Sequence, residues 1–417
     1  MQIIRNVRLR GRDGMVDVAI NGELIAAVEP SIDASADREY DGHGNLLLPG
    51  LVNAHQHLDK TMLGEVMRPN RSQTLQEAIY ITWDHKRSYT SEEIASRATP
   101  VVETAILSGT TAMRVFADVD PIGGLVPVET LIEIKRRFRG LIALEVVAFP
   151  QEAIVREPGT RALMEQAMEL GADVVGGLPW YERLDRHVHE HIDFCLELAQ
   201  RTDRDVHVLA DDTDDPTSRS LEYLAVRTIE TGYQGRVTAS HCGALAAYDD
   251  AHAARVIELV REAGITICSN AQISLVLDGR GDRGLIRRGI TRVRELLDAG
   301  VNVITAQDDV NDPYYPFGKP DQLEVAQYMA HVAQLTYPPQ LETVIDMVTI
   351  NAARAMRLKR YGTEPGNRAD LVLVDAPTVH EALRLIPPRR LVFHRGRLVA
   401  EGRLERVLHA QPAAVSA

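Results

Sequence analysis

Residues 142–148 read Ile-Ala-Leu-Glu-Val-Val-Ala, an apolar run that only Glu145 interrupts. Strands of a parallel sheet are buried on both faces, so they read as continuous apolar segments. Similar runs recur about every thirty residues, the length of one strand-helix repeat, and each is followed by a helical pattern. The eight runs lie at residues 45–54, 110–117, 141–149, 172–177, 205–210, 236–240, 265–269 and 301–306. They predict an α/β protein with a (β/α)8 (TIM) barrel, and an open doubly wound sheet is the alternative.

The two ends of the chain have a different texture. Residues 16–28 form an alternating strand pattern around an Asn-Gly turn at 21–22, which is typical of a β-hairpin. Residues 369–400 repeat this texture, with an Arg-Gly turn at 395–396. We therefore expect a small β-sandwich-like domain built from both termini, residues 1–48 and 362–417. The barrel would then occupy residues 49–361.

Charge and composition exclude several classes of protein. Among 417 residues, 46 Lys and Arg face 59 Asp and Glu, so the formal charge is −13. Nucleic-acid binding needs clustered positive charge, which this balance does not offer. The sequence shows neither an apolar run of about 18 residues nor the long apolar region of a signal peptide. Its three cysteines are far apart and fit free thiols. These features predict a cytoplasmic protein that binds neither nucleic acid nor membranes, with a homo-oligomer left open.

Side chains that bind metals or carry protons follow four of the apolar runs. They are His55 and His57, Asp211 and Asp212, His241, and Asp308 and Asp309. Active sites of such barrels lie at the carboxyl ends of the strands. Two histidines at i and i+2 on a strand point the same way and can reach one metal ion. A lone pair of this kind is more often a surface feature, but ligand-type residues at four strand ends indicate a site.

Four segments resemble the amidohydrolase superfamily, and within it the cytosine deaminase branch. Residues 49–60 (PGLVNAHQHLDK) match the opening metal motif, and residues 147–152 resemble the segment that binds the substrate amide. Residues 235–241 and 308–316 also match closely. The His-x-His-x-Asp-Lys ending of the first segment is similar to that of triazine-ring aminohydrolases. The resemblance extends almost from end to end.

The resemblance implies one divalent metal ion, zinc or iron, at the barrel mouth. His55, His57 and Asp308 match ligands of the family. His241 matches a histidine that orients the attacking hydroxide, and Asp212 falls where the family has a proton-carrying glutamate. A bound metal brings the pKa of its water to about 7, and a nearby carboxylate can accept and return the proton.

The resemblance also implies a small heterocyclic substrate. Gln151 and Asp309 match groups that hydrogen-bond the ring, and Tyr314 falls where cytosine deaminase has a tryptophan against it. We therefore expect a hydrolytic deaminase or aminohydrolase that acts on a C–N bond of a pyrimidine or triazine. A ring-opening cyclic amidase is the alternative among enzymes.

Three residues depart from the family pattern, and all three concern the metal centre. Leu209 stands at the position of a metal-binding histidine, Phe116 replaces a histidine of the nearest relatives, and Asp212 is shorter than a glutamate. Leucine cannot coordinate a metal. A metal-free barrel that binds a ligand without catalysis is therefore a further alternative.

Three neighbouring residues could restore the lost ligand. His207 shares the parity of Leu209 but would lie about 6.6 Å deeper along the strand, at about 3.3 Å per residue. Asp211 shares that parity on the mouth side, so it is the better geometric substitute. His241 could turn onto the metal. Elsewhere, Trp180 either lines the pocket or caps the barrel, Lys60 is expected in solvent, and Cys242 is expected as a packed thiol.

Overall fold

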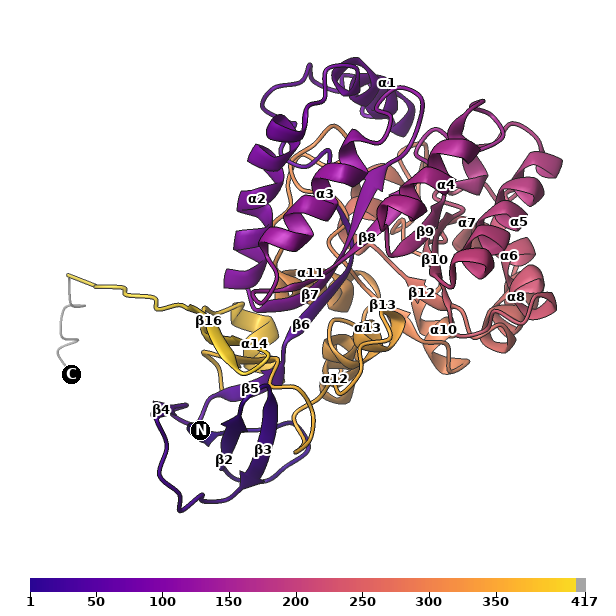
Figure 1. Cartoon of the computed structure of the whole chain (residues 1–417). Helices are drawn as coiled ribbons and strands as arrows, with labels where there is room; N and C mark the ends of the chain where they lie inside the picture. The colour runs from indigo at the N-terminus through magenta and orange to yellow at the C-terminus, as the bar shows by residue number, and fades with distance from the viewer. Residues whose placement is uncertain (410–417) are drawn as a thin grey trace.

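Eight parallel strands form the central sheet of this computed structural model, which describes residues 1–409 (Figure 1). Their order in the sheet is β13-β12-β11-β10-β9-β8-β7-β6. The strands are β6 (Leu51–His57), β7 (Thr110–Asp118), β8 (Ala143–Phe149), β9 (Val174–Gly177), β10 (Asp205–Ala210), β11 (Val237–His241), β12 (Thr266–Cys268) and β13 (Val303–Ile304). Each overlaps one of the predicted apolar runs, but the run 45–54 also contains β5 (Leu46–Pro49), which belongs to another sheet.

The chain after β13 closes this sheet into a barrel. Gln56 of β6 forms a parallel bridge with Asp308. The backbone amide of His57 donates to the carbonyl oxygen of Asp308 over 2.8 Å, and the amide of Asp308 donates to His55 over 2.9 Å. The predicted barrel is confirmed, and the open sheet is excluded. Closure also brings both ends of the predicted metal motif together.

Helices pack around the barrel and connect its strands (Figure 1). They are α1 (Leu75–Lys86), α2 (Ser91–Leu107), α3 (Val126–Arg137), α4 (Thr160–Leu170), η1 (Pro179–Tyr181), α5 (Asp185–Thr202), α6 (Ser220–Glu230), α7 (Ala244–Ala247), α8 (Asp250–Glu262), α9 (Ala271–Leu277), α10 (Val293–Asp298), α11 (Gln322–Val332), α12 (Pro338–Asp346), α13 (Ile350–Ala355) and α14 (Val379–Leu385). The Thr90 side chain caps α2 by accepting from the amide of Glu93. Gly171 ends α4 at a φ of 110°, a left-handed conformation that suits glycine.

Two four-stranded sheets lie at the ends of the chain. The first has the order β3-β2-β1-β4, and the second has the order β16-β15-β14-β5. Their strands are β1 (Gln2–Val7), β2 (Val16–Asn21), β3 (Leu24–Glu29), β4 (Arg38–Asp41), β5 (Leu46–Pro49), β14 (Leu371–Val374), β15 (Arg389–His394) and β16 (Arg397–Glu401). Because β5 pairs with β14, both termini build this part of the molecule, as predicted. The boundaries at residues 48 and 362 stay a prediction, and residues 410–417 lie outside the described part.

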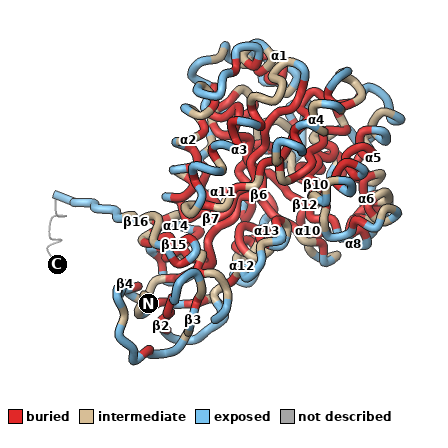
Figure 2. Tube along the Cα trace, viewed as in Figure 1, coloured by how far each residue is buried: buried red, intermediate tan, exposed pale blue. Residues whose placement is uncertain are grey.

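Strand β14 joins the terminal sheets to the barrel. Leu371 and Leu373 point into the apolar core that the two terminal sheets share. Val372 and Val374 belong to the large core around the barrel, as the period-2 alternation of a strand requires. Figure 2 shows the barrel strands buried beneath the surrounding helices. Among residues 1–409, no helix is both long enough and apolar enough to span a bilayer.

Candidate active site

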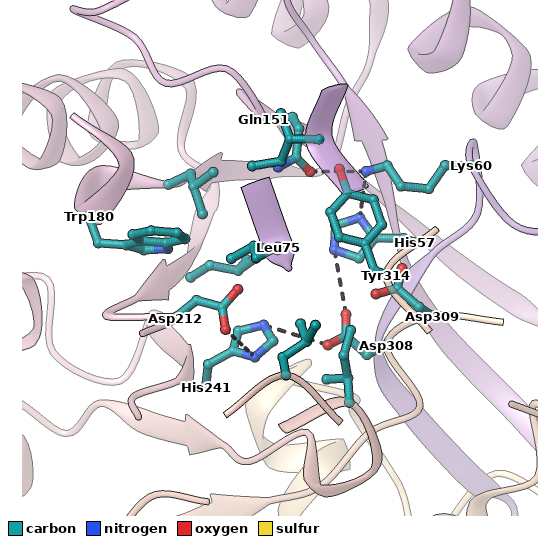
Figure 3. A pocket seen from close by; sticks show the side chains of 15 residues that line it. His57, Lys60, Leu75, Gln151, Trp180, Asp212, His241, Asp308, Asp309 and Tyr314 are labelled. Atoms are coloured by element: carbon teal, nitrogen blue, oxygen red, sulfur yellow. Dashed lines mark hydrogen bonds and ion pairs between the residues drawn. The ribbon is translucent and has the colours of Figure 1, made fainter. Parts of the chain in front are cut away.

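The predicted site residues meet at the carboxyl ends of the barrel strands. His55 and His57 end β6, Gln151 follows β8, and His241 ends β11. The remaining members, which follow β10 and β13, are Asp212, Asp308, Asp309 and Tyr314. All of these except His55 line one pocket, whose labelled side chains point toward one another in Figure 3. His55 lies beneath the pocket floor and is fully buried.

Three donor atoms of the predicted metal ligands lie close together. The Nε2 atoms of His55 and His57 are 3.3 Å apart. Oδ1 of Asp308 lies 3.0 Å from Nε2 of His55 and 3.5 Å from Nε2 of His57. Tetrahedral zinc with bonds of 2.0–2.1 Å separates its ligand atoms by about 3.3–3.4 Å, so these distances fit one ion. Oδ1 of Asp308 is buried and accepts no hydrogen bond, which also suits a metal ligand.

Protonation states at this centre favour coordination. Burial lowers the pKa of His55 and of His57, so both imidazoles are neutral and can offer a lone pair. Burial opposes ionisation of Asp308, but the neighbouring His55 and His241 lower its pKa below the ordinary value. The set therefore offers two neutral nitrogens and one carboxylate.

Neighbouring side chains orient two of these donors, His55 and Asp308. Nδ1 of His55 lies 2.8 Å from Oγ of Ser240, and the Phe116 ring stacks on His55 with centroids 4.1 Å apart. Nδ2 of Asn270 donates to Oδ2 of Asp308 over 3.0 Å. Such outer partners fix ring and carboxylate orientation in metal sites. Phe116, at the position where the resemblance implied a histidine in the nearest relatives, thus packs against a predicted ligand.

Strand β10 supplies no ligand to this centre. Leu209 lines the pocket with an aliphatic side chain. The expectation that Asp211 replaces the ligand is wrong, because its carboxylate accepts hydrogen bonds from Ser220 and from the amide of Leu221 at the start of α6. His207 is fully buried below the centre, with Nε2 2.5 Å from Oγ of Ser240. The fifth strand is therefore apolar where the family pattern has a histidine.

Asp212 and His241 form a pair beside the three donors. Nδ1 of His241 lies 3.2 Å from Oδ1 of Asp212, and its Nε2 lies 3.6 Å from Oδ2 of Asp308. Burial and the negative charge of Asp308 raise the pKa of Asp212 to about 8. A carboxyl group whose pKa lies near neutrality can both accept and donate a proton. Burial lowers the pKa of His241, so its ring is neutral.

Backbone strain concentrates at these strand ends. Asp211, His241 and Asp308 have φ values of 54°, 65° and 70°, in the left-handed region that non-glycine residues rarely adopt. Each such residue costs about 1–3 kcal/mol and persists where the surrounding structure fixes it, often in active sites. Here the conformation turns the chain sharply at the barrel mouth.

The residues expected to hold a ring lie on the other side of the pocket. Oε1 of Gln151 accepts a hydrogen bond from Lys60 over 3.1 Å, so its amide N–H groups are left to donate. Burial, together with Asp312 and Asp308, raises the pKa of Asp309 well above its ordinary value. Tyr314 is buried and borders the pocket. This side can therefore donate hydrogen bonds to a polar ring edge.

Lys60 contradicts its prediction, because it is 1% exposed rather than solvated. Its Nζ lies 2.7 Å from Asp118, 3.1 Å from Nδ1 of His57 and 3.1 Å from Gln151. Lys86 lies beside it, 2.7 Å from both Asp118 and Asp120. Two lysines thus neutralise a cluster of carboxylates under the polar side of the pocket.

Three further residues complete the comparison with the sequence predictions. Trp180 lines the pocket. Cys242 is a buried free thiol whose pKa burial raises, as expected. Asn270 was missed, although it directly follows the predicted strand 265–269. The rule that selected Asp308 at a strand end would also have selected Asn270.

A closed (β/α)8 barrel with histidines and carboxylates gathered at the carboxyl ends of its strands is typical of metal-dependent barrel enzymes. Residues 81–400 match the model of the Amidohydrolase family. The chain is 30% identical over 407 residues to N-isopropylammelide isopropyl amidohydrolase of Pseudomonas sp. (strain ADP), covering 96% of this chain and 97% of that protein. The chain therefore belongs to the amidohydrolase family.

Two solved structures are similar over nearly the whole chain. The 5-methylcytosine deaminase from Klebsiella pneumoniae, liganded with 5-fluorocytosine, superposes with a TM-score of 0.93 at 35% identity, covering 98% of this chain and 99% of that one. The N-isopropylammelide isopropylaminohydrolase from Burkholderia multivorans superposes with a TM-score of 0.83 at 32% identity, covering 96% and 98%. These relatives confirm the predicted class, a hydrolytic enzyme that acts on C–N bonds of small nitrogen heterocycles. The family uses a divalent metal, which the His and Asp cluster here can accommodate.

Proposed function

We propose that this enzyme removes an amine from a pyrimidine or triazine ring, with His55, His57 and Asp308 as ligands of one divalent ion. The observation that carries the proposal is that these three donors lie together at the barrel mouth, where His57 and Asp308 line the same pocket as Asp212 and His241. When bound, the ion supplies Lewis-acid activation of a water molecule. Three protein ligands and an open position are typical of catalytic zinc sites, so the loss of a β10 ligand does not remove the chemistry. Zinc and iron both remain candidates for this position.

Asp212 is the proton carrier in this proposal. Its carboxylate takes a proton from the attacking water and returns it to the nitrogen that leaves the ring. Nδ1 of His241 faces Oδ1 of Asp212 at 3.2 Å, and its Nε2 faces Oδ2 of Asp308 at 3.6 Å. We assign His241 the role of orienting both the water and Asp212.

Gln151, Asp309 and Tyr314 bind the ring in this proposal. The free N–H groups of Gln151 donate to a ring carbonyl or ring nitrogen. Asp309, protonated because its pKa is raised, donates as well. Tyr314 covers one face of the ring. Lys60 fixes the amide orientation of Gln151 through its Oε1 atom.

The experiment is a turnover assay with metal analysis. Purified enzyme is given aminopyrimidines, aminotriazines and a cyclic amide, and the released amine and the ring product are both identified. We expect amine release with an intact ring, whereas a ring-opened product would support the amidase alternative. Asp212→Asn should lower kcat by about 10²–10⁴-fold and keep its metal, because it removes proton transfer only. His55→Ala should lose the metal.

Other outcomes would contradict the proposal. Full turnover by Asp212→Asn, or by His55→Ala at matched metal content, would remove the proposed roles. A wild-type enzyme that binds no divalent metal would support the metal-free alternative.

A cytoplasmic location also stays a proposal, supported by three buried free cysteines.

A further inference from the structure

Two neighbouring loops bring different parts of the pocket into place. The loop after β8 carries Gln151, which contacts the ring in the proposed function, and the loop after β9 carries Leu178 and Trp180. Strands β8 and β9 are adjacent in the barrel, and Figure 3 shows Gln151 and Trp180 around the same pocket. The placement of one loop against the other therefore sets the room between these two side chains.

Glu182, the residue after η1, joins the two loops through a buried carboxylate. Its Oε1 accepts hydrogen bonds from the amides of Ile154 and Val155 over 2.9 and 2.8 Å. Its Oε2 accepts a hydrogen bond from the amide of Arg156 over 2.8 Å. Successive backbone N–H groups of this kind form an anion-binding nest. Here the anion is a side chain of the protein itself, and it comes from the neighbouring loop.

A histidine of α5 completes the set of donors to this carboxylate. The backbone amide of Leu178 donates to Nε2 of His191 over 3.0 Å, so a neutral ring carries its proton on Nδ1. Nδ1 donates to Oε1 of Glu182 over 2.9 Å. Burial lowers the pKa of His191, which keeps the ring neutral. Burial opposes ionisation of Glu182, but the hydrogen bonds from His191 and the loop amides lower its pKa below the ordinary value.

The turn that carries Gln151 is strained. The amide of Ala153 donates to the carbonyl oxygen of Pro150 over 2.9 Å, which closes a tight turn around Gln151. Ala153 has a φ of 67°, in the left-handed region that non-glycine residues rarely adopt. Such a conformation persists where the surrounding structure fixes it. The nest begins at the next residue, Ile154, so Glu182 holds the chain directly after the strained position.

We propose that Glu182 is a positioning residue for ring binding, because it fixes the turn of Gln151 and the placement of this turn against Trp180. This inference rests on the proposed function, in which Gln151 donates hydrogen bonds to the ring. Within residues 1–409, Glu182 is not part of the pocket lining, so it acts through the loop and not on the ring. A turn that is held in place before the ring arrives loses less conformational freedom on binding.

The test is Glu182→Gln. A glutamine offers one acceptor oxygen, and its NH2 group faces a backbone N–H donor, so part of the anchor is lost. We expect the KM for cytosine and for ammelide to rise about 5- to 10-fold, the contribution of one hydrogen bond to the ring. The value of kcat should stay within about twofold of the wild type, since a loss of uniform binding changes KM alone. Wild-type KM values in Glu182→Gln would overturn the inference.

A double-mutant cycle separates positioning from a general loss of stability. In the Gln151→Ala background, Glu182→Gln should change KM by less than about twofold, because the side chain that Glu182 positions is gone. An equal rise of KM in both backgrounds would overturn the inference. Glu93→Gln is the matched control, since the Glu93 carboxylate also contacts a histidine, His85, and pairs with Arg97. The control should leave KM unchanged, and a rise equal to that in Glu182→Gln would overturn the inference.

Hydrogen exchange tests the anchor without any ligand. The amides of residues 154–156 should exchange about tenfold faster in Glu182→Gln than in the wild type, because they lose their acceptor. Exchange in β8 should stay unchanged. Wild-type exchange at residues 154–156 would overturn the inference. If Glu182→Gln does not fold, Glu182→Asp takes its place in every measurement, since it keeps the charge but is one methylene too short to reach all the donors.

Binding separates this inference from the proposed function. If neither cytosine nor ammelide is hydrolysed, the proposed function fails. Calorimetric titration of cytosine onto the four proteins of the cycle then replaces KM by Kd. A Kd raised about 5- to 10-fold by Glu182→Gln only when Gln151 is present would still support the positioning role. Equal Kd values in all four proteins would overturn it.

Discussion

Asn270 donates a hydrogen bond from Nδ2 to Oδ2 of Asp308 over 3.0 Å. Oδ1 of the same carboxylate faces His55, whose Nε2 lies 3.0 Å away. One oxygen is thus tied to the end of β12, and this leaves the other directed at the two histidines. Partners of this kind orient metal ligands and commonly contribute 10–100-fold to metal affinity.

We expect Asn270→Ala to weaken metal binding by about 10–100-fold, because the Asp308 carboxylate can then rotate. Competition with a chelator of known affinity measures this. Asn302→Ala is the control. Asn302 lies just before β13, and its side-chain amide donates to Thr266 and to the carbonyl oxygen of Asn351 rather than to a predicted metal ligand. Wild-type metal affinity in Asn270→Ala would show that Asp308 is held by other contacts.

Leu209 offers a direct test of the ligand set. Leu209→His should tighten metal binding by at least about tenfold, because it adds a fourth protein ligand to a three-ligand site. Leu178→His places a histidine in the lining of the same pocket, away from the family's ligand position, and should not tighten metal binding. Competition with a chelator measures the metal affinity of both variants and of the wild type. Equal affinities in all three would mean that Leu209 does not lie at a coordination position.

Sequence patterns predict the barrel well, because its strands are buried on both faces and read as continuous apolar runs. Even β13, with two residues in the strand, lies inside the predicted run 301–306. The positions of His55, His57 and Asp308 also follow from a simple rule, since strand ends meet at one mouth. Their roles as metal ligands stay a prediction.

Other features depend on packing that a single sequence does not reveal. Lys60 reads as a loop lysine, and only the register between β6 and β7 brings Asp118 within 2.7 Å of it. Asp211 shares the parity of a ligand, but the left-handed turn after β10 directs its carboxylate to the start of α6. The alternation of apolar and polar residues along a strand does not predict such a turn at its end.

The buried cluster around Lys60 should stabilise the fold. Lys60→Met leaves Asp118 with one cation instead of two in a site closed to water. Removing one partner of a buried ion pair costs about 3–5 kcal/mol, so we expect a loss in the free energy of unfolding near the lower figure. Lys135→Met is the control, since the Lys135–Asp173 pair is partly exposed and such pairs contribute about 1 kcal/mol or less. Denaturant unfolding measures both, and equal losses would contradict a special role for the buried cluster.

Asp278 should make the free energy of unfolding fall as pH rises. Burial, together with Asp212 and Asp214, raises the pKa of Asp278 to about 8 from an ordinary value of 3.8. Between these values the folded protein holds a proton that the unfolded chain has lost. Folding is therefore favoured at low pH, and this advantage disappears as pH approaches 8. The side chain of the Asp278→Asn variant cannot ionise, so its free energy of unfolding should not fall in this way. The difference in free energy of unfolding between the variant and the wild type should therefore be about 1 kcal/mol or more larger at pH 8 than at pH 5, in favour of the variant.

Asp282 provides a control of opposite sign on the same loop. Its hydrogen bonds with Arg287 lower its pKa to about 2, so its contribution is complete above the unfolded value and is lost only as pH falls toward 2. Asp282→Asn should therefore cost the same stability at pH 5 and at pH 8. Urea unfolding of the wild type and both variants at the two pH values is the measurement. A gain for Asp278→Asn that does not change between pH 5 and pH 8 would show that Asp278 ionises normally, and that the groove lined by Asp212 and Asp278 is open to water.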